Sequence, residues 1–206
     1  MTEKEVRSIS STLELRSAEG SEKEVITGYA LKFNRWSSVL GGWFKEIIDP
    51  RALDQADMSN VVALFNHDES KVLARTGINL KLDVDDIGLR FEFTPNGTTY
   101  AKDLLENIRS GIITQCSFAF TIPNERDSEE WADGEDGIME RRIKRFDKIY
   151  DVSAVTTPAY PDTDVVVGAR SKEQAESITQ QKVLQSLEEQ RELESLEIEY
   201  SYITQN

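Results

Sequence analysis

The sequence predicts a mainly β protein with a few helices and an acidic helical segment at its end. Short stretches in which apolar and polar residues alternate recur through the first 155 residues, as in half-buried strands. Turn-forming Gly, Asp, Asn and Pro separate these stretches. The last 36 of the 206 residues contain neither Gly nor Pro and are dominated by Glu, Gln, Leu and Ser. We therefore divide the chain into a β-rich domain, residues 1–170, and a segment 171–206.

Alternation and turn signals together place the individual strands. The predicted strands cover residues 9–16, 25–33, 43–48, 61–65, 78–84, 89–94, 112–122, 138–146 and 149–155. The pair 78–84 and 89–94 is the clearest. Leu80 and Leu82 lie on one face of the first strand, and Phe91 and Phe93 lie on one face of the second. A short Asp/Gly turn joins the two strands. The highly acidic residues 124–137 are predicted to form an exposed loop.

Two helices are predicted inside the β-rich domain. Residues 98–109 place Ala101, Leu104 and Ile108 at helical spacing, and Gly111 suits the C-terminal end. Asp49 and Pro50 resemble a helix start, with a capping acceptor followed by proline at the first helical position, so a short helix is expected to end near residue 58.

The segment 171–206 has two readings from its composition. Val183, Leu187 and Leu196 belong to a broken apolar stripe that is too irregular for a heptad repeat. One reading is a helix that is marginal alone and needs a partner surface, which a second subunit could supply. The other is a partly disordered acidic tail.

Composition excludes several classes of function. Lys and Arg number 24 against 38 Asp and Glu, a net charge of −14 that argues against nucleic-acid binding. No apolar stretch is long enough to span a membrane, the start of the chain is not a secretory signal, and we expect a cytoplasmic protein. A single cysteine and a single histidine argue against disulfides and metal sites, and no cofactor is expected.

The only histidine, His67, follows the predicted strand 61–65 and stands between Asn66 and Asp68. A side chain at a strand end is held by the strand while its tip stays accessible, which suits a catalytic group. Any chemistry that needs an imidazole must use this residue. Most isolated histidines nevertheless have no chemical role, so its position alone does not assign one.

The predicted strand 112–122 contains two possible nucleophiles, and alternation places them on opposite faces. Cys116 shares a face with Phe118 and Phe120 and is expected in the core, where a thiol is inert. Ser117 lies on the other face, beside the small Ala119. An ordinary strand serine is the simpler reading, because a hydroxyl becomes a nucleophile only beside a base that a third group orients.

A third group would be a carboxylate after Ser117, and Asp147 and Asp151 are both candidates that spacing does not separate. The order His, Ser, acid is not that of the α/β-hydrolases, since the Gly-x-Ser-x-Gly motif is absent.

Six collinear stretches between about residues 25 and 168 resemble the tailed-phage prohead protease family. They are Phe65-Asn66-His67-Asp68, residues 72–76, residues 88–92, residues 100–111, Ser117-Phe118-Ala119-Phe120 and residues 149–161. The resemblance implies a herpesvirus-protease-like β-barrel flanked by helices. It also implies His67 as general base, Ser117 as nucleophile and Asp151, where relatives usually carry Glu, as the third member. Arg75 is an additional candidate for an oxyanion donor.

The implied function is a serine endopeptidase of capsid maturation. Its substrates would be the scaffolding segment of the major capsid protein and the protease itself, inside the immature capsid in the host cytoplasm, and we expect a homo-oligomer. The first alternative is a non-enzymatic capsid-assembly or scaffold-binding protein with a degenerate protease fold. The second is a small β-barrel that binds peptides or sugars.

Overall fold

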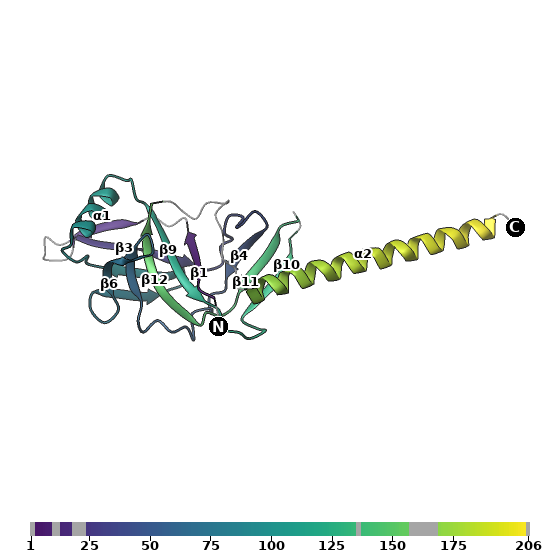
Figure 1. The fold of residues 1–206 in the computed structure, drawn as a ribbon, viewed down its shortest axis with the longest axis horizontal. Helices are drawn as coiled ribbons and strands as arrows, with labels where there is room; N and C mark the ends of the chain where they lie inside the picture. Colours follow the sequence, from purple (N-terminus) through teal and green to yellow (C-terminus); the bar gives the residue numbers. More distant parts are fainter. Residues whose placement is uncertain (1–2, 10–12, 18–23, 135–136, 157–168, 205–206) are drawn as a thin grey trace.

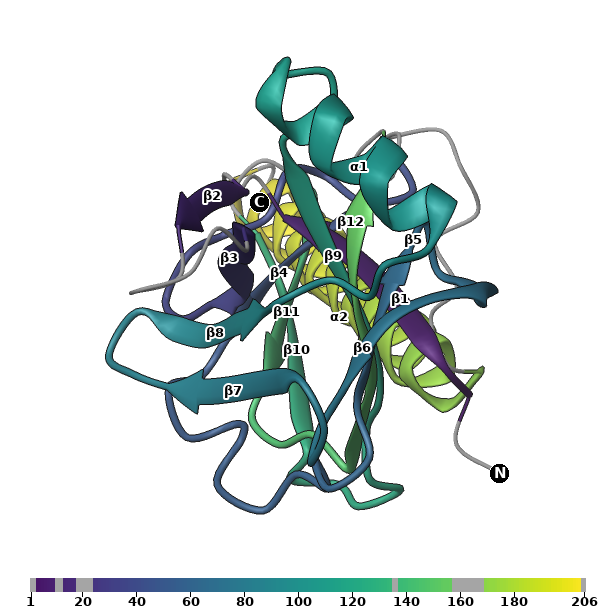
Figure 2. The same ribbon diagram turned by 90° about the vertical axis from the view of Figure 1, so that its left-hand side faces the viewer.

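The computed structural model describes residues 3–9, 13–17, 24–134, 137–156 and 169–204. Its described strands form three sheets, and the chain is mainly β as predicted. A closed barrel is not confirmed for this part of the chain. Figure 1 shows the sheets gathered in one body from which a long helix projects, and Figure 2 shows that body from its far end.

The five-stranded sheet has the order β1-β9-β12-β5-β6. Its strands are β1 Glu5–Ile9, β9 Gln115–Thr121, β12 Lys148–Val155, β5 Val62–Phe65 and β6 Asp68–Arg75. β12 runs antiparallel to β9 and parallel to β5, so segments far apart in sequence meet at the centre of the sheet. β6 was not predicted.

The four-stranded sheet has the order β2-β3-β8-β7, with β2 Glu14–Ser17, β3 Glu24–Lys32, β8 Gly88–Phe93 and β7 Leu80–Val84. The predicted β7–β8 hairpin is confirmed. Asp85 closes its turn by accepting bonds from the amides of Ile87 at 2.8 Å and Gly88 at 3.0 Å. Gly88 is required there because a Cβ would lie 2.0 Å from the Leu31 carbonyl oxygen.

The three-stranded sheet has the order β10-β11-β4, with β10 Glu129–Asp133, β11 Met139–Ile143 and β4 Phe44–Ile48. The prediction of a loop throughout 124–137 is therefore wrong at β10. Trp131 of this strand is buried, and the buried Glu129 is paired with Arg141 of β11 at 2.7 Å. The acidic composition of 124–137 suggested an exposed loop. A strand forms there because the buried acid Glu129 is neutralised by Arg141, twelve positions later in the chain.

The short helix predicted at 50–58 is also wrong, because the chain forms turns there. The amide of Ala52 bonds to the Asp49 carbonyl, but the carbonyl of Ala52 accepts from the amide of Phe146 at 2.8 Å, so it is used in a tertiary contact. The predicted strand 9–16 is divided between β1 and β2, and its residues 10–12 lie outside the described residues.

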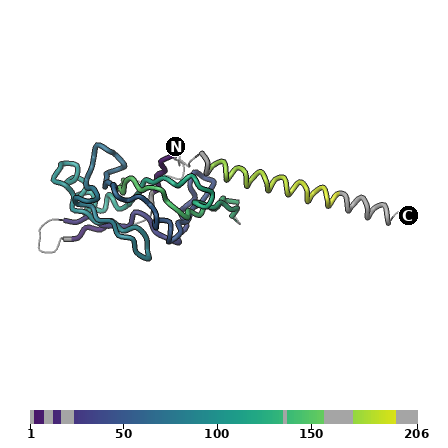
Figure 3. The backbone as a smooth tube through the Cα atoms, turned by 90° about the horizontal axis from the view of Figure 1, so that it is seen from below, coloured from purple at the N-terminus to yellow at the C-terminus, as the bar shows by residue number. Residues whose placement is uncertain are grey.

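Two helices are present in the described chain: α1, Thr99–Arg109, as predicted, and α2, Ala169–Thr204. Ala101, Leu104 and Ile108 bury the inner face of α1 in the main core. Ala175 and Ile178 pack the start of α2 against a cluster that includes Trp131 and Met139. The rest of α2 extends away from the body (Figures 1 and 3).

Candidate active site

His67 lies at the tip of the hairpin between β5 and β6. Phe65 pairs with Asp68, so Asn66 and His67 form a two-residue turn, with φ angles of 55° and 56°. Both values lie in the left-handed region that such hairpin turns require and that Asn and His adopt more readily than most residues. The amide of Asn66 bonds to the Ala154 carbonyl, and its side-chain oxygen accepts from the amide of Thr156, both at 2.9 Å. These bonds attach the turn to the end of β12.

Strand register places the other polar groups on one face of the sheet. Ser117 of β9 is directly opposite Ser153 of β12, and Ala119 is opposite Asp151. Directly opposed residues project from the same face, so Ser117, Asp151 and Ser153 share a face. Cys116 and Phe118 project from the other face into the main core, as predicted.

The three predicted side chains meet through hydrogen bonds. Nε2 of His67 is 2.6 Å from Oγ of Ser117, and Nδ1 of the same ring is 2.6 Å from Oδ1 of Asp151. The hydroxyl of Ser153 donates to that same Oδ1 at 2.8 Å. Lys4 approaches the other carboxylate oxygen of Asp151, at 3.4 Å.

Burial differs among the three groups: Ser117 has 0% of its surface exposed and Asp151 has 1%, whereas the side chain of His67 is 22% exposed. Burial raises the pKa of Asp151. The hydrogen bond and electrostatic attraction of His67, with smaller contributions from Ser153 and Lys4, outweigh burial and hold that pKa below its usual value. Asp151 is therefore an ionised acceptor for the proton on Nδ1.

The remaining candidates have other hydrogen-bond partners, although Arg75 lines a pocket together with Lys4 and Asp151. Asp147 is exposed and accepts a bond from the Thr121 hydroxyl at 3.0 Å. Arg75 does not fit the oxyanion role, because its guanidinium bonds to the side chain of Asn60 and two strands, β12 and β5, separate its strand from that of Ser117.

Sequence reasoning missed three neighbours of the site. Ser153 could have been found, since it follows Asp151 by two positions on the same strand. Asn66 enters the sequence analysis only as the neighbour of His67 and as part of a family motif, and neither predicts its bonds to the end of β12. The carbonyl of Arg7, which accepts a bond from the Ser117 hydroxyl at 3.0 Å, has no signature in the sequence because any residue could supply it.

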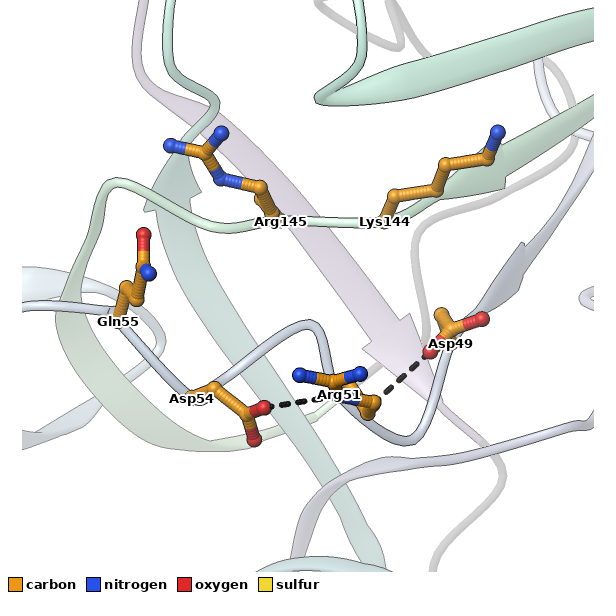
Figure 4. Close-up of a pocket in the computed structure, with 6 residues that line it drawn as sticks. All are labelled: Asp49, Arg51, Asp54, Gln55, Lys144 and Arg145. Carbon is orange, nitrogen blue, oxygen red and sulfur yellow. Dashed lines mark hydrogen bonds and ion pairs between the residues drawn. The ribbon is translucent and has the colours of Figure 1, made fainter.

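Nothing in the described part of the chain gathers three or more His, Cys, Asp or Glu side chains in a way that could hold a metal ion. The described helices also include none that is long and apolar enough to cross a membrane. A separate pocket (Figure 4) lies between the turns after β4 and the chain after β11. It is lined by Asp49, Arg51, Asp54, Gln55, Lys144 and Arg145. None of the predicted site residues lines it.

Comparison with known proteins gives a family and a structural relative. Residues 11–178 match the family described as caudovirus prohead serine protease. Among solved structures, the bacteriophage T4 capsid assembly protease gp21 is similar, with a TM-score of 0.51 and 14% sequence identity. That match covers 75% of this chain and 98% of gp21. No curated protein gives a significant match.

A hydroxyl, an imidazole and a carboxylate joined in series are the arrangement seen in serine hydrolases. The family match covers most of the chain, and the chain belongs to the caudovirus prohead serine protease family. The resemblance inferred from the sequence motifs is thereby confirmed, as is the assignment to a family of proteases.

Proposed function

We propose that this protein is a serine endopeptidase in which Ser117 is the nucleophile, His67 the general base and Asp151 the group that orients the imidazole. The observation that carries the proposal is the double contact of one ring: 2.6 Å from Nε2 to Ser117 Oγ and 2.6 Å from Nδ1 to Asp151 Oδ1. A serine hydroxyl is a weak nucleophile, and this arrangement supplies both the base and its orienting acid.

In the proposed mechanism, Nε2 of His67 accepts the Ser117 proton while Oγ attacks the carbonyl carbon of the scissile peptide bond. Asp151 holds the other ring proton on Nδ1 and stabilises the imidazolium that forms. The imidazolium then donates its proton to the leaving amine as the C–N bond breaks, which leaves an acyl ester on Ser117. Water, deprotonated by His67, hydrolyses this ester and restores the hydroxyl.

The proposed substrates are the scaffolding segment of the major capsid protein and the protease itself. The family description supports action in the prohead, and we place that prohead in the host cytoplasm. We also propose self-association, for which the exposed Val183, Leu184, Leu187 and Leu193 of α2 offer an apolar surface.

The test is co-expression with the major capsid protein of the same phage, followed by mass spectrometry of the capsid subunits. The wild-type chain should remove the scaffolding segment, whereas Ser117→Ala and His67→Ala should each abolish removal, since groups that act as a unit fail together. Ser59→Ala, at an exposed serine away from the site, is the control and should cleave normally. Trimmed subunits in the Ser117→Ala culture would refute the assignment of the nucleophile.

A further inference from the structure

β1 lies along the edge of the strand that carries the proposed nucleophile. It is the terminal strand of its sheet and pairs within that sheet with β9 alone. In this pairing Ser8 is opposite Ser117, and Val6 is opposite Ala119. The other edge of β9 is already paired with β12. An extended peptide that adds to a sheet bonds to a strand edge, so β1 occupies the backbone edge at which such a peptide could lie beside Ser117.

The backbone of β1 also competes for the proton of the nucleophile. The Ser117 hydroxyl has two acceptors within reach, Nε2 of His67 at 2.6 Å and the carbonyl oxygen of Arg7 at 3.0 Å. A hydroxyl has a single proton to donate. When that proton points to the Arg7 carbonyl, the Ser117 oxygen can be hydrogen-bonded to His67 only if Nε2 carries a proton. An imidazole that is protonated at Nε2 cannot accept the Ser117 proton and so cannot act as the base. The carbonyl of Arg7 therefore favours an unreactive arrangement.

The segment around β1 contacts a second member of the site. The ammonium of Lys4 lies 3.4 Å from Oδ2 of Asp151, while Ser117 itself has 0% of its surface exposed. A scissile carbonyl cannot contact Oγ while this arrangement persists. The same segment that approaches the proposed nucleophile is thus in contact with its orienting acid.

Buried ion pairs hold β1 in place without making the rest of the site depend on it. Arg7 pairs with Glu46 of β4 at 2.8 Å, and Glu5 pairs with Arg141 of β11 at 2.7 Å. Without β1, Arg141 still contacts Glu46 at 3.3 Å and Glu129 at 2.7 Å. Because β1 contributes one acid and one base, its departure leaves the net charge of the remaining cluster unchanged. The strand can therefore detach without leaving a buried charge unpaired.

We propose that β1 occupies the substrate-binding edge of β9, and that the substrate is an extended peptide segment which pairs with β9 after β1 has detached. This inference rests on the proposed function, because it assumes that Ser117 is the nucleophile. It adds where the peptide backbone binds and why the described conformation is a resting one.

The test measures how fast a fluorescent fluorophosphonate labels Ser117. Labelling forms a bond between Oγ and phosphorus, releases fluoride and passes the hydroxyl proton to His67, so it needs a reactive serine but no particular peptide sequence. Arg7→Ala removes the ion pair that attaches β1 to Glu46 of β4. Arg16→Ala, at an exposed arginine paired with the exposed Glu14, is the matched control.

Arg7→Ala should be labelled at least about tenfold faster than the wild type, the gain expected if β1 is detached in a tenth or less of wild-type molecules and is largely released in the variant. Deletion of residues 1–9 should have the same effect, and a synthetic peptide of residues 3–9 should slow the labelling of that deletion protein. Arg16→Ala should match the wild type. Equal rates for all folded variants, with no effect of the peptide, would overturn the proposal.

Hydrogen exchange on the intact wild-type chain gives a second readout that does not require a variant to fold. The amides of β1 should exchange faster than those of β12, because β1 detaches while the rest of the sheet stays intact. Equal protection of the two strands would contradict the proposal. The function itself fails in a different way: if no protein is labelled above the Ser117→Ala background, the assignment of the nucleophile is wrong whatever β1 does.

Discussion

The imidazole of His67 and the carboxylate of Asp151 meet at 2.6 Å although 84 positions separate them in the chain. The contact exists because β5 and β12 are parallel neighbours, with Val62 opposite Asp151 and Phe65 opposite Ala154. The turn that follows β5, which contains His67, therefore lies beside the end of β12, the strand that carries Asp151. The proposed base and its partner are positioned by strand pairing at the centre of one sheet.

Asp151→Asn should lower kcat by about 10³–10⁴-fold and leave the fold intact. An amide at this position can donate to Nδ1, which moves the ring proton to Nε2 and removes the acceptor that Ser117 needs. Cleavage kinetics on capsid protein would measure the loss. Asp147→Asn is the matched control, because Asp147 is exposed and bonded to Thr121, and it should retain full activity. A similar loss in both variants would refute the assignment of Asp151.

The stability contributed by Asp151 should depend on pH in the acid range. Its pKa is lower in the folded protein than the usual 3.8, so the folded state favours the ionised carboxylate. This contribution is fully present above the unfolded pKa and is lost as the pH falls through the folded pKa. Urea unfolding between pH 5 and pH 3 should therefore show the advantage of wild type over Asp151→Asn shrinking on acidification. An advantage that grows as the pH falls would contradict this sign.

Ser153→Ala should lower kcat about tenfold and leave KM nearly unchanged. Its hydroxyl donates to the Asp151 oxygen that faces His67, and a hydrogen bond to a buried carboxylate contributes about 1.5–3 kcal/mol. Ser59→Ala is a close control, since Ser59 also donates to the aspartate two positions earlier, at 2.6 Å, but on the surface. Steady-state kinetics separate the two parameters. A rise in KM at constant kcat would show that Ser153 binds substrate and does not position the acid.

At concentrations where the chain is monomeric, deleting residues 183–206 should change the melting temperature by less than about 2 °C, because Val183, Leu184 and Leu187 are at least half exposed. Deleting residues 172–206 should lower it by several degrees, since this removes the buried Ala175 and the packing of Ile178. Thermal unfolding followed by circular dichroism compares the two truncations. Equal melting temperatures would instead support the boundary near residue 170 as the end of an independent domain.

The faces of the strands could be predicted because side-chain direction follows from local alternation. Cys116 in the core and Ser117 on the opposite face needed only the two-residue period. Where residues make tertiary contacts, local rules failed. The residues after Asp49 do not form the predicted helix, because the Ala52 carbonyl bonds to the amide of Phe146. The acidic β10 could not be predicted from its composition, because its buried Glu129 is neutralised by Arg141 of another strand.

The sequence by itself determined a mainly β chain with an acidic C-terminal segment of different composition and a single imidazole, and it placed two possible nucleophiles on opposite faces of one strand. Only the tertiary structure decided which acid of a strongly acidic chain meets that imidazole, and that the Arg7 carbonyl lies beside Ser117. Periodicity reports the direction of a side chain along its own strand. It carries no information on which strands pair or in what register, and those pairings bring the distant groups together.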